Sequence, residues 1–370
     1  MSNVIKLVDI RLKTPLIPMI RAIRSGQLAQ GRYVKEFEES FARLSGARHA
    51  IAVNNGTTAL IAGLKALELK AGAEVITTPF TFGATVNSIL LAGYKVRFAD
   101  IEPDSYGISI DSIKARIKKN TKAVVPVHLY GNPCNLQALS QFAQEHSLRI
   151  VEDAAQAHGA RYEGFPVGTL DIGCFSFYAT KNIALGEGGV ITTNSDSVAA
   201  YVRMLRNQGM SARYEYAIVG ENLRLTEIQA LIGLPQLKEY DKLVEKRTRN
   251  AAMLIELLDG NPHIQVPTIS RNLRQVWHQF TIEVLETAKV DRAQLQRDLL
   301  ARGVESAVYY PKPLNEYPVF IEHPNVVVDD TPVASRVARR CLSLPIHQHL
   351  SSADLKTIAR EVNALTGYSR

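Results

Sequence analysis

Residues 148–156, Leu-Arg-Ile-Val-Glu-Asp-Ala-Ala-Gln, join a short apolar run to two consecutive acids. Such a run is typical of a buried strand in a parallel sheet. A carboxylate at the carboxyl end of such a strand faces the crevice in which α/β proteins bind ligands. We therefore expect Leu148–Glu152 to be a buried strand with Asp153 at its end. Similar runs occur earlier, at His49–Val53, Glu74–Thr78, Val96–Asp100 and Ala123–His128.

Longer helical patterns separate these runs over about the first 240 residues. Thr58–Leu69, for example, has Leu60, Leu64 and Leu67 at helical spacing directly after Gly56. A strand, a glycine turn and a helix therefore follow one another. This alternation predicts an α/β domain with a mostly parallel sheet wound by crossover helices.

The pattern changes in the last third of the chain. Leu223–Arg249 is predicted as one long helix that Pro235 interrupts, because proline removes a helical hydrogen bond. Trp277–Leu285 is predicted as a strand. We expect a large α/β domain over residues 1–245 and a smaller C-terminal α+β domain over residues 246–370.

Composition excludes several classes of protein. The 370 residues are 46% hydrophobic and 21% charged, as in an ordinary globular chain of about two domains. The net charge is +7, but the chain has no basic run with interleaved aromatics of the kind that indicates nucleic-acid binding. The positive charge is compatible with an anionic substrate. No apolar run approaches the roughly 20 residues that span a bilayer. Met1–Leu16 lacks the apolar core of a signal peptide, so we expect a cytoplasmic protein.

The cysteines and histidines give no sign of a metal centre. Cys134, Cys174 and Cys341 are far apart and odd in number, which favours buried thiols in a reducing compartment over a disulfide framework. The histidines show no metal-ligand spacing. We expect no metal site.

Two residues carry most of the predicted chemistry. Asp153 can hold a positively charged group in the crevice, although an aspartate after a strand is also commonly a helix cap. Lys181 follows the apolar run Cys174–Phe177. Its amine, once neutral, can form an imine with a carbonyl carbon, and Ser176 can donate a hydrogen bond to a phosphate. A solvated surface lysine is the alternative.

Two glycine-containing segments have different implications. Gly186–Gly189 has neither the GxGxxG spacing nor the following helix of a dinucleotide loop, so a nicotinamide enzyme is disfavoured and a tight turn is favoured. In Asn54–Thr58, backbone amides and hydroxyls meet the positive end of the predicted helix. That segment predicts a phosphate site, with an ordinary turn capped by Thr57 as the alternative.

Taken together, these motifs resemble the DegT/DnrJ/EryC1/StrS family of sugar aminotransferases. The resemblance implies an aspartate aminotransferase-like fold, which is fold type I of the enzymes that use pyridoxal 5′-phosphate (PLP). It covers nearly the whole chain, namely Gly31, Val34, Phe37 and Glu38, then Gly56 and Thr57, Glu152–Gln156, Ser176–Lys181, Glu187–Gly189, Gly220, Asn222, Arg224 and Thr226, and finally Leu344 and Pro345.

The resemblance also implies roles for individual residues. Lys181 would hold PLP as a Schiff base and move protons, Asp153 would pair with the pyridine nitrogen, and Gln156 would lie near the ring hydroxyl. The phosphate would be held by Ser176, Gly56 and Thr57. Phe82 would stack over the cofactor, unless it is a core aromatic at a helix start. Asn222 would reach the phosphate of a second subunit, which implies a homodimer with shared active sites.

The implied reaction moves an amino group from glutamate or glutamine to the keto group of a sugar, usually a nucleotide-linked one. Two alternatives remain within the family. One is a PLP-dependent nucleotide-sugar dehydratase, although such relatives typically have histidine in place of the lysine or carry an iron-sulfur cluster. The other is a non-catalytic regulatory member.

Asn315 departs from the family, which often has histidine there. His158 is expected to satisfy a core hydrogen bond.

Overall fold

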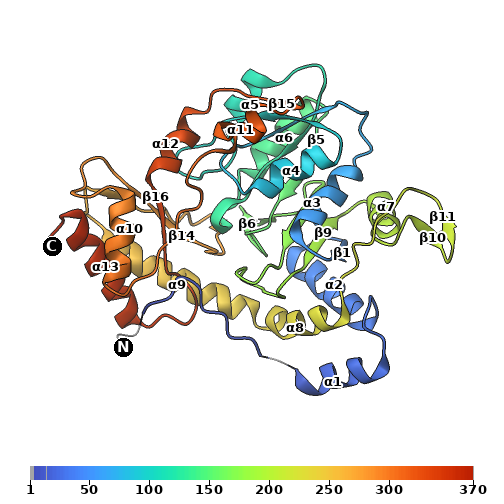
Figure 1. Ribbon diagram of the computed structural model, residues 1–370, viewed down its shortest axis with the longest axis horizontal. Helices are drawn as coiled ribbons and strands as arrows, with labels where there is room; N and C mark the ends of the chain where they lie inside the picture. The colour runs from blue at the N-terminus through green and yellow to red at the C-terminus, as the bar shows by residue number, and fades with distance from the viewer. Residues whose placement is uncertain (1–3, 14, 370) are drawn as a thin grey trace.

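The computed structural model describes residues 4–13 and 15–369. The other five residues, which the predicted domain limits include, lie outside the described part of the chain. At the centre is one large twisted sheet, with helices packed around it and a second layer of helices and short strands at one end of the molecule (Figure 1).

Eight strands form the large sheet in the described part of the chain. In spatial order they are β1 (His49–Val53), β9 (Gly189–Thr193), β8 (Ile172–Ser176), β5 (Arg149–Asp153), β4 (Thr121–Val125), β2 (Glu74–Thr77), β3 (Lys95–Phe98) and β15 (Val326–Val327). From β8 to β15 every neighbouring pair is parallel, whereas β9 runs antiparallel to both β8 and β1. The predicted α/β class with a mostly parallel sheet is confirmed.

The five strands expected before residue 153 are all present, with ends shifted by up to three residues. β4 ends at Val125 rather than at His128. The next residue, Pro126, has no N–H to continue the ladder. Beyond Pro126 an isolated bridge continues the pairing, in which the His128 backbone N–H donates to the Asp153 carbonyl at 3.0 Å, so His128 lies beside the carboxyl end of β5.

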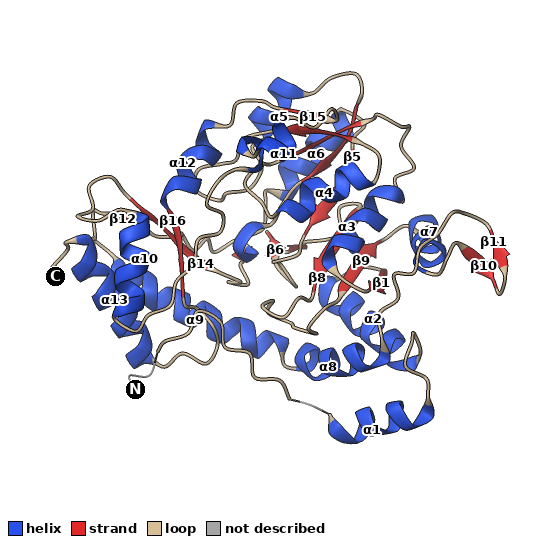
Figure 2. Ribbon diagram, viewed as in Figure 1, coloured by secondary structure: helices blue, strands red, loops and turns tan. Residues whose placement is uncertain are grey.

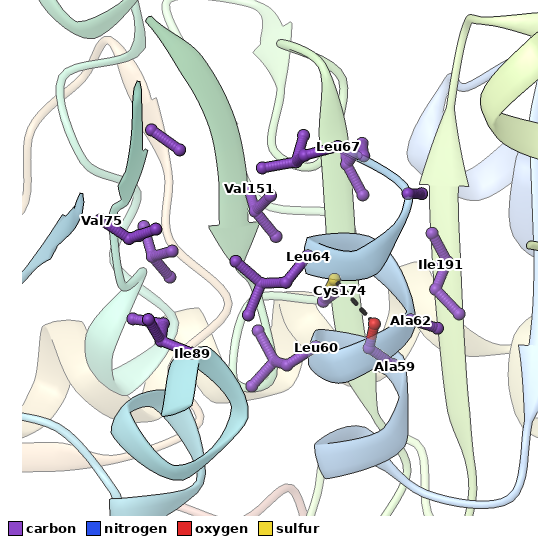
Figure 3. Close-up of a cluster of buried hydrophobic side chains, with 14 of the residues drawn as sticks. Ala59, Leu60, Ala62, Leu64, Leu67, Val75, Ile89, Val151, Cys174 and Ile191 are labelled. Atoms are coloured by element: carbon purple, nitrogen blue, oxygen red, sulfur yellow. Dashed lines mark hydrogen bonds between the residues drawn. The ribbon is translucent and has the colours of Figure 1, made fainter. Parts of the chain in front are cut away.

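The first crossover helix, α3 (Gly56–Lys65), begins earlier and ends earlier than predicted. The Asn55 side chain accepts from the Thr58 backbone N–H and so caps the helix, so a cap at Thr57, which was the alternative for this segment, is wrong. Leu60 and Leu64 face the sheet. They join a buried cluster with Val151 and Cys174, whose thiol donates to the Ala59 carbonyl of α3 at 3.3 Å (Figure 3).

The predicted long helix Leu223–Arg249 is wrong, because two helices occupy the segment. α8 (Glu227–Lys238) runs through Pro235, and the break comes at Glu239, before α9 (Tyr240–Leu258). Gln236, next to the proline, donates from its side chain to the Ile232 carbonyl of the same helix at 2.9 Å. The two helices run one after the other across the lower part of the molecule in Figure 1, with α1 below α8.

The C-terminal layer has its own apolar core. A three-stranded antiparallel sheet of β12 (Ile264–Gln265), β14 (Phe280–Val284) and β16 (Cys341–Leu344) is covered by α10 (Arg292–Ala301) and α13 (Ser352–Thr366). In α9, Val244 belongs to the core of the large domain and Ala251 to that of the small layer. The limit between residues 245 and 246 stays a prediction.

Further elements surround this framework (Figure 2). They are α1 (Leu16–Ser25), α2 (Arg32–Ser45), α4 (Gly83–Leu91), α5 (Ile110–Arg116), α6 (Leu136–Glu145), α7 (Asp196–Arg206), α11 (Pro318–Ile321), α12 (Pro332–Arg340), β6 (Arg161–Tyr162), β7 (Phe165–Pro166), β10 (Met210–Ala212), β11 (Glu215–Tyr216) and β13 (Leu273–Arg274). The hairpin β10–β11 and helix α1 project from the large domain in Figure 1. Within the described ranges, no helix has both the length and the apolar character that crossing a bilayer requires.

Candidate active site

A cavity of about 830 Å³ opens at the carboxyl ends of β5 and β8. The N-terminal turns of α3 and α4 and the loop between β8 and β9 complete its wall. Of the predicted site residues, it is lined by Gly56, Thr57, Phe82, Asp153, Gln156, Ser176 and Lys181. The fold thus brings together residues that are up to 125 positions apart in the sequence.

Asp153 ends β5 and is 5% exposed. Its Oδ1 accepts from the Ala155 backbone N–H at 3.2 Å, and its Oδ2 accepts from the Thr85 hydroxyl at 2.7 Å. Turns rather than a helix follow β5, so the helix-cap alternative is wrong. Burial raises the pKa of Asp153, and the Thr85 hydroxyl, the Ala155 N–H, Lys181 and His128 oppose that rise.

Lys181 lies in the loop between β8 and β9, and part of its surface faces the cavity. The loop is anchored by its neighbour, because the Asn182 side chain donates to the Val276 carbonyl at 2.8 Å. Burial lowers the pKa of Lys181 to about 8, although Asp153 opposes the shift. The alternative of a solvated surface lysine is therefore wrong. An appreciable share of the amine is neutral, and hence nucleophilic, near neutral pH.

The start of α3 packs closely against the end of β8 beside the cavity. Within the described residues, the backbone N–H groups of Gly56 and Thr57 have no acceptor, and both residues face the cavity. A Cβ on Gly56 would lie 2.5 Å from the Ser176 Cβ, so only glycine allows the two segments to approach this closely. Free N–H groups at the positive end of a helix, beside a serine hydroxyl, suit a phosphate.

The glycines that follow Lys181 also serve close packing. A Cβ on Gly189, the first residue of β9, would lie 2.1 Å from the Asn55 carbonyl oxygen. Gly186 has φ +84°, a left-handed conformation that favours glycine. The segment is a turn between the antiparallel strands β8 and β9, as the sequence favoured. This turn holds the β8–β9 loop against the cap of α3.

Aromatic and amide side chains also line the cavity. The Gln156 Oε1 accepts from the Tyr130 backbone N–H at 2.7 Å, and its Nε2 approaches the Tyr310 hydroxyl at 3.4 Å. Phe82 is 63% exposed, and its ring centroid lies 6.1 Å from that of Tyr310. Phe82 is thus no core aromatic. Its ring offers an apolar face to the cavity.

His158 and Asn315 both have structural partners. His158 is buried, its Nε2 lies 2.9 Å from the Ser176 carbonyl, and its ring stacks on Phe177 with centroids 4.7 Å apart. Burial lowers its pKa to about 3, so the ring is neutral and its predicted core role is confirmed. At the position where the family often has histidine, Asn315 donates to the Asp329 carbonyl and the Thr331 hydroxyl, and it does not line the cavity.

A model of the DegT/DnrJ/EryC1/StrS aminotransferase family matches residues 16–363. The chain belongs to this family. The predicted family is confirmed.

Relatives match the chain along most of its length. GDP-perosamine synthase of Caulobacter vibrioides is 38% identical over 333 residues, which cover 89% of this chain and 88% of that protein. UDP-N-acetyl-3-dehydro-alpha-D-glucosamine 3-aminotransferase of Acidithiobacillus ferrooxidans is 38% identical over 334 residues, with 89% and 87% covered. The crystal structure of S. venezuelae DesV in complex with a ketimine intermediate superposes with a TM-score of 0.90 at 33% identity, over 96% of this chain and 94% of that one. The predicted aspartate aminotransferase-like fold is confirmed.

In this family member, Asn222 lies apart from the other predicted site residues. It is exposed, in the segment between β11 and α8, and does not line the cavity of its own chain. Its action on the site of a second subunit stays a prediction.

Other residues in and around the cavity carry no signal in the sequence. Thr81 lines it, and Thr85 bonds to Asp153 from the next turn of α4. His278 lines it as well, and burial holds the pKa of His278 well below its usual value. His128 pairs with the buried Glu152 at 3.0 Å behind Asp153. None of these residues lies in a motif that reports a site, since their roles depend on contacts between distant segments.

Proposed function

We propose that this protein is a PLP-dependent aminotransferase that moves an amino group from glutamate or glutamine to the keto group of a nucleotide-linked sugar, in amino-sugar biosynthesis. The observation that carries the proposal is the cavity in which a lysine of lowered pKa, a buried carboxylate and an anion site face one another. The GDP- and UDP-linked sugars in the names of the relatives support the substrate class.

The residues of the cavity fit the cofactor. Gly56, Thr57 and Ser176 would hold its phosphate, because their unpaired N–H groups and hydroxyl face the cavity. Asp153 would hold the protonated ring nitrogen, since opposite charges at close range favour both charged forms. The exposed ring of Phe82 would cover one face of the cofactor ring.

Each residue then has a chemical task. When bound, PLP supplies an electron-withdrawing ring that stabilises negative charge on the carbon next to the transferred nitrogen. Lys181 would be the base that moves a proton between two carbons, because its pKa of about 8 suits neutral pH. Asp153 keeps its charge beside the ring nitrogen, and Gln156 offers its amide beside Tyr310.

The alternatives within the family are a nucleotide-sugar dehydratase and a non-catalytic regulator. Lys181 argues against both. It occupies the position at which the dehydratases typically have histidine, and its buried amine has the lowered pKa that imine chemistry needs.

We also propose a cytoplasmic homodimer with shared active sites. Asn222 is exposed and does not line the cavity of its own chain, as expected of a residue that serves a neighbouring subunit. The projecting helix α1 leaves apolar side chains exposed that a second copy would cover, namely Leu16, Ile17, Ile20 and Ile23.

The test is an absorbance spectrum of the purified protein with PLP, before and after glutamate is added. The wild type should show the visible band of an imine-linked cofactor, and glutamate should shift the band to that of the aminated cofactor. A Lys181→Ala variant should lose the lysine-dependent band. A wild type that binds no PLP, or binds it without a lysine-dependent imine, would contradict the proposal.

A further inference from the structure

Two threonine hydroxyls from the start of α4 form a hydrogen-bonded chain that ends on Asp153. The Thr85 Oγ1 lies 2.7 Å from Asp153 Oδ2, and the Thr81 Oγ1 lies 2.8 Å from that of Thr85. Thr81 and Thr85 are 2% and 1% exposed. Bonds of this kind, shielded from water and accepted by a charged group, are stronger than bonds at the surface.

The ionisation of Asp153 fixes the direction of this chain. A hydroxyl has one proton to donate. Because Thr85 donates its proton to the Asp153 carboxylate, Thr85 can only accept from Thr81. A protonated Asp153 would instead compete to donate to Thr85, so the chain favours the carboxylate form.

The same bonds fix the carboxylate in orientation. Oδ1 is held by the Ala155 N–H and Oδ2 by Thr85, one donor for each oxygen. Each oxygen can accept one further hydrogen bond. Asp153 is therefore presented to the cavity in one orientation, and each oxygen keeps acceptor capacity for a donor such as a protonated ring nitrogen.

The other groups near Asp153 do not replace Thr85. Lys181 and His128 act on it through charge, while the ring of His128 is bonded to Glu152 and to the Cys134 N–H. Tyr310 and Cys174 also face Asp153, but burial raises the pKa of both, and they stay neutral. In the described part of the chain, Thr85 has the only side chain hydrogen-bonded to the carboxylate.

We propose that Thr85, supported by Thr81, is a positioning residue that holds Asp153 as an oriented carboxylate for the ring nitrogen of PLP. This inference rests on the proposed function. It predicts that removing the Thr85 hydroxyl weakens the binding of PLP but not the binding of an analogue that lacks the ring nitrogen.

The experiment compares the affinity of Thr85→Val and Thr85→Ser for PLP and for an analogue with carbon in place of the ring nitrogen. A hydrogen bond to a charged group corresponds to roughly a ten- to hundred-fold change in an equilibrium constant. We expect Thr85→Val to bind PLP about ten-fold more weakly and to bind the analogue as the wild type does. Thr85→Ser retains the hydroxyl and should restore PLP binding.

Thr77→Val is the matched control, because it removes a buried hydroxyl that donates to the Val125 carbonyl at 2.8 Å, away from the cavity. It should leave the ratio of the two affinities unchanged. An equal loss of both ligands in Thr85→Val, or no loss of either, would overturn the inference. A wild type that binds PLP no better than the control ligand pyridine would instead overturn the proposed function.

Discussion

Replacing Gly56 with alanine tests the contact on which the anion site depends. The added Cβ would lie 2.5 Å from the Ser176 Cβ, whereas ordinary contact begins at 3.4 Å. It would also lie 3.1 Å from the Ser176 Cα, so rotating a side chain cannot relieve the clash. The start of α3 and the end of β8 must move apart by about 0.9 Å. Overpacking of this kind typically costs about 1–3 kcal/mol of folding free energy.

Gly83→Ala is the matched control. Gly83 is the first residue of α4, as Gly56 is of α3, and a Cβ there meets only the Asn87 Nδ2 at 3.8 Å. Alanine reduces the conformational entropy of the unfolded chain, which stabilises a protein by about 0.4–1 kcal/mol where the site tolerates it. We therefore expect Gly83→Ala to be neutral or stabilising and Gly56→Ala to be destabilising.

The assay has two parts. Thermal unfolding of the variants, measured side by side without cofactor, should give a lower midpoint for Gly56→Ala than for Gly83→Ala. Titration with PLP and with pyridoxal, which lacks the phosphate, should show that Gly56→Ala weakens PLP binding more than pyridoxal binding. Equal midpoints would refute the packing argument, and an equal loss for both ligands would refute the phosphate assignment.

Three further predictions follow. Leu64 is fully buried in the core of Figure 3, so Leu64→Ala should lower the unfolding free energy by about 2–5 kcal/mol, measured by denaturant titration. A change within about 0.5 kcal/mol would contradict this packing. The rate at which pyridoxal forms an imine with Lys181 should rise with pH and level off above about 8, because burial lowers the pKa of Lys181 and only the neutral amine reacts. A rate that keeps rising to pH 10 would count against this. Asn315→Ala should lower the unfolding free energy by about 1–3 kcal/mol in the same titration, since the Asp329 carbonyl and the Thr331 hydroxyl each lose a donor. The activity of the folded variant should stay close to that of the wild type, because Asn315 does not line the cavity.

Local sequence patterns predicted the framework of this protein. Buried strands of a parallel sheet appear as short apolar runs, so the strand that ends at Asp153 was found without any tertiary information. Lys181 and the segment at Gly56 were found because each adjoins a strand or a helix start whose pattern is local. Nearly all the predicted site residues consequently face one cavity.

The tertiary structure decided what local patterns do not encode. The Asn55 side chain, rather than Thr57, caps α3, because it accepts from the Thr58 backbone N–H, and α8 continues past Pro235 to Lys238. Thr85 reaches Asp153 across 68 positions of the sequence. Such contacts join residues whose own neighbours carry no periodic signal. The sequence by itself therefore determined the sheet and the reactive groups, whereas the folded chain alone decided how they are oriented and how their charge is held.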